Sequence, residues 1–130
     1  MDLGLKGLRA VVTGGTKGIG RAIADTLAAE GTHVAFCARN AAEVTATEAA
    51  LAAKGVTAVG RVVDVSDGAA LAAFVDEAAA VMGGLDIVVA NVSALAIPND
   101  EAGWKAGFET DMMGTVRLVN ARHRLEKLKE

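Results

Sequence analysis

The feature that most limits the possible folds is a fourfold alternation of short apolar runs with longer segments of helical periodicity. The apolar runs predict β-strands at residues 9–13, 33–37, 56–64 and 86–91. The helical segments lie at residues 18–30, 40–54 and 66–82, and from residue 99 nearly to the C-terminus. Strands that are apolar on both faces and separated by helices indicate a parallel sheet covered on both sides. We therefore predict one α/β domain over residues 1–130, with helices on both faces of a four-stranded parallel sheet.

Composition excludes several classes of protein. With a formal net charge of −3 and 3% aromatic residues, the chain lacks the basic surface and the stacking platforms that nucleic-acid binding uses. No apolar run approaches the roughly 18 residues that cross a membrane, and the N-terminus lacks the order of a signal peptide. The single cysteine, Cys37, allows no internal disulfide and is expected to be buried and inert. A chain with so little cysteine fits a reducing compartment, and we expect a cytoplasmic protein. We expect no metal site, because His33 and His123 are far apart in the sequence and lack partner ligands.

Two of the expected helices have an apolar stripe, which in an amphipathic helix is the side turned to the core. In residues 18–30 the stripe consists of Ile19, Ile23 and Leu27. In the last helix it consists of Trp104, Phe108, Met112, Val116 and Val119. The methionines, including Met82 and Met113, also fit core packing better than a ligand role.

A glycine-rich segment, Thr13-Gly14-Gly15-Thr16-Lys17-Gly18-Ile19-Gly20, joins the first expected strand to the first expected helix. Gly14 can adopt the positive φ of a tight turn, Gly18 lets the backbone approach a pyrophosphate, and Gly20 lets the helix pack closely on the strand. The pyrophosphate would then meet free N–H groups at the start of the helix. The alternative is that these glycines only shape a turn and a cap. Because a strand precedes the segment and a helix follows it, the pattern favours a dinucleotide site.

The pattern Thr-Gly-x-x-x-Gly-Ile-Gly at residues 13–20 resembles the cofactor motif of the short-chain dehydrogenase/reductase family. Four further matches follow in the family's order: Arg39, Asp64-Val65, residues 85–91 at the fourth strand, and residues 108–117 in the long interface helix. The resemblance covers essentially the whole chain. It implies a Rossmann-like sheet in the strand order 3-2-1-4 and binding of a nicotinamide dinucleotide, with Thr16 and Ile19 among the loop residues at the cofactor.

At the adenosine end, the resemblance implies a choice between two cofactors. NAD-dependent members carry an acid near the end of the second strand, whereas this chain has Arg39 there and Lys17 in the glycine loop. Two cations suit the 2′-phosphate of NADP, so NADP is favoured over NAD; the alternative is that both are solvated surface cations. Asp64 would accept a hydrogen bond from the adenine amine, and Val65 would supply a backbone contact. The alternative for Asp64 is a loop aspartate near a helix cap.

At the nicotinamide end, the sequence departs from the family pattern. Asn91 would hold the central strands together and line the ribose, but Ala90 replaces an Asn, and Val92-Ser93 replaces Ala-Gly. The Ser93 hydroxyl could still hydrogen-bond the ribose. Asp111 stands where many members carry a helix Asn that supports the proton relay, and an ionised carboxylate cannot donate the same hydrogen bonds. The alternative for Asp111 is a solvated helix aspartate.

The family's catalytic Ser and Tyr-x-x-x-Lys follow the long helix, and these 130 residues contain no tyrosine. We therefore expect a truncated half of the fold that binds the cofactor but cannot reduce carbonyls at an enzymatic rate. The segment 121–130 is dense in charge and in helix-forming residues, which favours a helix end that was deliberately extended; the alternative is an ordinary solvated helix end. Two alternatives stay open: an engineered or minimal Rossmann half that binds no ligand usefully, and an oxidoreductase that needs a complementing C-terminal half.

Two surfaces favour self-association. The expected strand at 86–91 becomes an edge, and its segment Ile87-Val88-Val89 has no charge or proline to block pairing. The stripe from Trp104 to Val119 is apolar and would lose its usual neighbours. We therefore expect a homodimer or a larger oligomer, formed through one of these two surfaces.

Overall fold

The computed structural model describes residues 1–93 and 99–128. Residues 94–98, which include Pro98, and residues 129–130 of the charged C-terminal segment lie outside the described residues. The helices and strands follow the predicted alternation, in the order β1 (Arg9–Thr13), α1 (Gly18–Ala29), β2 (His33–Ala38), α2 (Ala41–Ala52), β3 (Ala58–Val62), α3 (Gly68–Met82), β4 (Ile87–Val89), α4 (Glu101–Gly107), η1 (Phe108–Met112) and α5 (Met113–Leu128).

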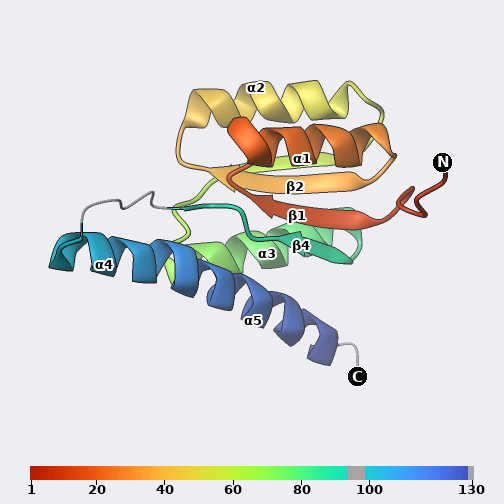
Figure 1. Ribbon diagram of the computed structural model, residues 1–130. Helices are drawn as coiled ribbons and strands as arrows, with labels where there is room; N and C mark the ends of the chain where they lie inside the picture. Colours follow the sequence, from red (N-terminus) through yellow and green to blue (C-terminus); the bar gives the residue numbers. More distant parts are fainter. Residues whose placement is uncertain (94–98, 129–130) are drawn as a thin grey trace.

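The sheet has four parallel strands in the order β3-β2-β1-β4 (Figure 1), which confirms the predicted fold and strand order. Thr13 lies opposite Cys37 in the register between β1 and β2, and Val12 lies opposite Val89 in the register between β1 and β4. The chain builds outwards from β1 to β3 and then returns to the other side of β1. This reversal places the topological switch point of the sheet between β1 and β4, where open α/β sheets bind ligands.

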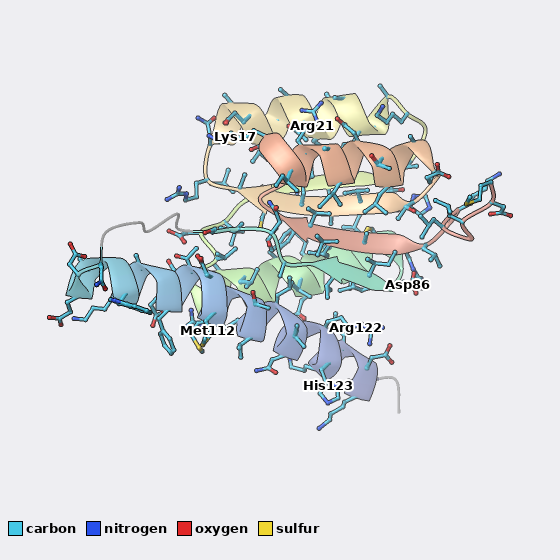
Figure 2. The ribbon with its side chains drawn as sticks, viewed as in Figure 1. Lys17, Arg21, Asp86, Met112, Arg122 and His123 are labelled. Atoms are coloured by element: carbon cyan, nitrogen blue, oxygen red, sulfur yellow. The ribbon has the colours of Figure 1, made fainter. Side chains whose placement is uncertain are left out.

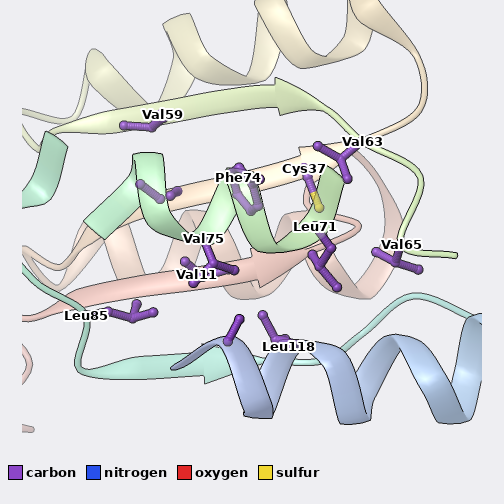
Figure 3. Packing of buried hydrophobic residues seen from close by; sticks show 13 residues of the cluster. Val11, Cys37, Val59, Val63, Val65, Leu71, Phe74, Val75, Leu85 and Leu118 are labelled. Carbon is purple, nitrogen blue, oxygen red and sulfur yellow. The ribbon is translucent and has the colours of Figure 1, made fainter. Parts of the chain in front are cut away.

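Alternate residues of the strands fill two separate cores. On one side, Val12, Val34 and Phe36 pack against α1 and α2. On the other side, Val11, Ala35 and Cys37 pack against α3 and α5, where Leu71, Phe74, Val75 and Leu118 close the layer (Figure 3). This two-sided burial is why the strands are apolar at nearly every position. Burial also raises the pKa of the Cys37 thiol to about 11, which keeps it an unreactive thiol at neutral pH.

The apolar stripe predicted for α1 is not the most buried side of the helix. Its buried residues are Gly20, Ala24 and Ala28, whereas Ile23 and Leu27 are only partly buried and Ile19 is 74% exposed. Small residues let the helix axis approach the sheet, so small side chains rather than large apolar ones occupy the inward side. Ile19 therefore stands at the solvent-facing start of the helix, beside the glycine loop.

The last helical region consists of three consecutive segments rather than one regular helix. Helix α4, the π-helical segment η1 and helix α5 follow one another without a break (Figure 1). The side turned to the core carries Gly114, Leu118 and Ala121. All members of the predicted apolar stripe are exposed: Trp104, Phe108, Met112, Val116 and Val119. The expectation that Met112 packs in the core is wrong, since its side chain is 58% exposed and points away from the sheet (Figure 2).

The helix starts agree closely with the sequence. Asn40 caps α2 by accepting a hydrogen bond from the backbone of Glu43 at 3.0 Å. Asp67 caps α3 by accepting from the backbone N–H of Ala70, and Asp100 caps α4 by accepting from the backbone N–H of Gly103. Strands β3 and β4 cover only part of the apolar runs that predicted them.

Candidate functional site

The predicted site residues lie where the strands end. The glycine loop follows β1, Arg39 follows β2, Asp64 follows β3 and Asn91 follows β4. Because the four strands are parallel, these positions share the carboxyl edge of the sheet. The loop and Asn91 flank the switch point between β1 and β4, which is the usual ligand crevice of such sheets.

The glycine loop has the backbone shape of an anion site. Gly14 has φ +73° and Gly18 has φ +61°, values that glycine adopts without strain. The Gly14 amide donates to the Cys37 carbonyl at 2.8 Å, which ties the loop to β2. A Cβ on Gly18 would meet no atom within 4 Å among the described residues, so the backbone is open there. Helix α1 begins after Lys17, whose backbone is extended, and among the described residues no side chain caps its first turn. The backbone N–H groups of that first turn therefore face outwards.

Gly20 is closely enclosed. A Cβ at this position would overlap the Gly14 carbonyl oxygen and lie 2.5 Å from Asn91 Nδ2. Gly15, which the motif analysis did not single out, is under similar constraint, since its Cβ would lie 2.7 Å from Phe36 Cβ. Gly15 lies two residues after the end of β1, the strand in which Val12 pairs with Phe36. Gly14 combines both demands, because it has a positive φ and a Cβ on it would lie 2.9 Å from Asn91 Nδ2 and from Val92 Cγ2.

Asn91 joins the end of β4 to the glycine loop. Its backbone N–H donates to Thr13 Oγ1 at 3.1 Å, and its Nδ2 donates to the Gly14 carbonyl at 3.2 Å. Thr13, which the sequence did not suggest as a linking residue, also donates from its hydroxyl to the Val89 carbonyl at 3.4 Å. These bonds hold the two sides of the switch point together. Asn91 itself is half-buried.

Two cations lie beside this crevice, at the loop and at the end of β2. The Lys17 side chain is 86% exposed, and its Nζ lies 3.9 Å from Glu43 Oε1 (Figure 2). Arg39 is also exposed. Glu43 was not recognised in the sequence, because its approach to Lys17 depends on how α2 lies over the loop. Its carboxylate reduces the positive charge that Lys17 offers to an anion.

The segment after β3 places Asp64 and Val65 differently. Val65 is buried in the core, whereas Asp64 is exposed and accepts hydrogen bonds at Oδ1 from the Ser66 backbone at 2.9 Å and the Ser66 hydroxyl at 2.7 Å. These bonds, with a smaller contribution from the Arg39 charge, lower the pKa of the Asp64 carboxyl. Asp64 is therefore an ionised acceptor at neutral pH.

Ser93 and Asp111 are brought together from distant parts of the chain. The Ser93 hydroxyl donates to Asp111 Oδ2 at 2.8 Å, and the Asp111 carbonyl accepts from the Thr115 hydroxyl. Asp111 lies in the π-helical segment η1, an irregularity often found at functional sites. The remaining predicted residue, Thr16, is half-buried in the glycine loop.

Other possible sites are limited. Within residues 1–93 and 99–128, no three His, Cys, Asp or Glu side chains gather as metal ligands would. No helix in the same ranges is both long and apolar enough to span a bilayer. A hollow of about 340 Å³ lies between α3 and α5, lined in part by Gly84, Leu85 and Arg122. Leu85 precedes β4, so this hollow lies at the amino edge of the sheet, opposite the glycine loop.

Comparison with known proteins gives consistent matches. The sequence profile of the family described as short chain dehydrogenase matches residues 9–128. Isoepoxydon dehydrogenase of Penicillium expansum is 36% identical over 127 residues, which cover 93% of this chain and 48% of that protein. The chain thus spans about half the length of this relative.

Solved structures match in the same way. A short-chain dehydrogenase of Burkholderia cenocepacia J2315 in complex with NADP is 32% identical with a TM-score of 0.81, over 93% of this chain and 51% of that one. An NAD⁺-bound xylitol dehydrogenase is 25% identical with a TM-score of 0.87, over 96% of this chain and 50% of that one. The two structures hold different nicotinamide cofactors, so the likeness alone does not select between them.

Proposed function

The chain belongs to the short-chain dehydrogenase family, and on that premise we propose that it binds a nicotinamide dinucleotide at the carboxyl edge of its sheet, NADP(H) in preference to NAD(H). The observation that carries the proposal is the open glycine loop at the uncapped start of α1, held in place by Asn91. Backbone N–H groups at a helix start, together with the helix dipole, favour a pyrophosphate. Gly18 leaves the room that the phosphates need.

The side chains around the loop fit the rest of such a ligand. Lys17 and Arg39 can turn towards a 2′-phosphate, because both side chains are exposed. Asp64 is an ionised acceptor for the adenine amine, and Asn91 and Ser93 offer polar groups to the ribose on the nicotinamide side. When bound, the dinucleotide would supply hydride chemistry; the residues described here bind and orient it.

The test is a thermal-shift titration with NADP⁺, NADPH, NAD⁺ and NADH. A ligand that binds only the folded chain at about 100 times its Kd adds about 2.7 kcal/mol, or roughly 8 °C in Tm for a domain of this size. We expect NADP(H) to reach this shift at lower concentration than NAD(H). If no dinucleotide moves the Tm at millimolar concentration, the chain is a structural half-fold and the proposal is wrong.

We further propose that the chain forms a homodimer through the exposed stripe of α4, η1 and α5. Five large apolar side chains on one continuous helical surface are unusual for a monomer. Replacing Val116 within the stripe with glutamate is expected to give a monomeric mass in light scattering at high micromolar concentration. The control is Val81→Glu, because Val81 is similarly exposed but lies on α3. A parent chain that is already monomeric at that concentration would contradict the proposal.

A further inference from the structure

The loop that carries Asp64 rests against a residue of α5. Arg117 Nη1 donates to the Ser66 carbonyl at 3.1 Å, and Arg117 Nη2 donates to Glu109 Oε2 at 3.2 Å. The Arg117 side chain is only 28% exposed, so its guanidinium is held between the loop and the helix rather than extended into water. A loop carbonyl with a charged donor is more strongly fixed than one bonded to water.

Two glycines allow this close approach. A Cβ on Gly68, the first residue of α3, would lie 3.1 Å from Arg117 Cδ and Nε. A Cβ on Gly114 would lie 3.2 Å from Val65 Cγ2. Both distances are tighter than ordinary side-chain contact, so a larger residue at either position would require Arg117 or Val65 to shift. The position of the loop is therefore set by α5 as well as by the strand that precedes it.

Ser66 connects this contact to Asp64. The carbonyl of Ser66 accepts from Arg117, while its N–H and its hydroxyl both donate to Asp64 Oδ1. A shift of Ser66 as a whole would therefore alter the direction of the Asp64 carboxylate. Glu109, Arg117, Ser66 and Asp64 form one continuous line of polar contacts from η1 to the carboxyl edge of the sheet.

We propose that Arg117 is a positioning residue for adenine recognition, holding the loop so that Asp64 faces the adenine amine. The inference rests on the proposed function, because it assigns the adenine end of the dinucleotide to Asp64. Arg117 does not itself touch the ligand and acts through Ser66. Its effect falls on the discrimination between adenine and other bases, and not on the pyrophosphate contacts of the glycine loop.

The experiment compares NADP⁺ with its hypoxanthine analogue, which lacks the amine, by calorimetric titration. The parent chain is expected to bind NADP⁺ about tenfold more tightly, the value of one hydrogen bond to a charged acceptor. Arg117→Met is expected to lower this ratio by at least about threefold, and Asp64→Ala to remove it. In the double variant Arg117→Met/Asp64→Ala, no further loss is expected, because both changes act on one contact.

Arg124→Met is the matched control. Like Arg117→Met, this substitution removes a guanidinium of α5 that pairs with an acid. The partner of Arg124 is Asp76 of α3, at 2.6 Å, and the pair lies away from the loop that carries Asp64. Its ratio is expected to equal that of the parent. An unchanged ratio in Arg117→Met, or an equal loss in Arg124→Met, would show that Arg117 only contributes to stability and would overturn the inference.

A second measurement needs no dinucleotide. The pKa of the Asp64 carboxyl, which the Ser66 bonds lower, is expected to rise towards its ordinary value in Arg117→Met when followed by carbon NMR. Glu109→Gln, which keeps the shape of the side chain, should move the same pKa in the same direction by a smaller amount. If the pKa moves but the parent chain binds neither nucleotide, the proposed function fails while the mechanical link stands; an unmoved pKa overturns the link itself.

Discussion

Replacing Gly20 with alanine is expected to abolish dinucleotide binding and to lower the free energy of unfolding by about 3 kcal/mol, the sum of an overpacked contact and a lost hydrogen bond. The added methyl group would overlap the Gly14 carbonyl and crowd Asn91 Nδ2. Relief of that overlap must move the start of α1 away from the end of β1. The movement would break the bond between Asn91 and Gly14 and change the direction of the N–H groups that would hold the pyrophosphate.

The matched control is Gly107→Ala. Gly107 is also helical, with φ −62°, and within the described part of the chain a Cβ there would meet no atom within 4 Å. This change is expected to raise the free energy of unfolding by about 0.5–1 kcal/mol, because alanine restricts the unfolded chain and favours helix. Urea denaturation measures both variants, and titration with NADP⁺ measures binding. A Gly20→Ala chain as stable as its parent would contradict the packing argument.

The sequence could predict those parts of the fold that depend on residues close together in the chain. Each strand is marked by consecutive β-branched and apolar residues, and each long helix by a cap such as Asn40 or a left-handed glycine such as Gly83. The predicted parallel sheet is confirmed because strands apolar on both faces have few other arrangements. The order β3-β2-β1-β4 came from the resemblance to the family, and the structure agrees with it.

The burial of particular helix faces could not be predicted as well. Hydrophobic periodicity finds an apolar stripe but does not say whether that stripe meets the sheet or a surface. Ile19 and Met112 both belong to regular apolar stripes, and both are exposed. In α1 and α5 the buried side is chosen by small residues, Gly20 and Gly114, which allow the closest approach. Side-chain size therefore competes with hydrophobicity in setting the orientation of these helices.

Contacts between distant segments explain what the site prediction missed. The glycine loop was recognisable because its residues are consecutive. Glu43 near Lys17, the Ser93–Asp111 bond and the Arg117–Ser66 bond each join residues separated by at least 18 positions. Such pairs arise from the way helices lie across the sheet, which a single sequence does not specify. The unpredicted residues are accordingly those that hold or modify the site.

The largest expected effect on cofactor choice comes from the double variant Lys17→Met/Arg39→Met. Loss of both cations is expected to weaken binding of NADP⁺ by about 30-fold, because each charge-assisted bond to a phosphate contributes more than a neutral one. Binding of NAD⁺ should change by less than about twofold, since it carries no 2′-phosphate for these cations to recognise. The measurement is the ratio of the two dissociation constants at fixed ionic strength, because salt screens such exposed charges. Lys54→Met, which removes one positive charge beyond the far end of α2, should leave the ratio unchanged.

Glu43 provides the opposite change in the same measurement. Its carboxylate lies 3.9 Å from Lys17 Nζ and would oppose the approach of a phosphate. Glu43→Gln keeps the backbone N–H that Asn40 caps and removes only the charge, so NADP⁺ should bind about threefold more tightly, within the range of one exposed ion pair. In the Lys17→Met background the same substitution should have a smaller effect, because the partner of the pair is gone. If Glu43→Gln strengthens NAD⁺ and NADP⁺ equally, the gain comes from the pyrophosphate, and the 2′-phosphate does not lie between Lys17 and Arg39.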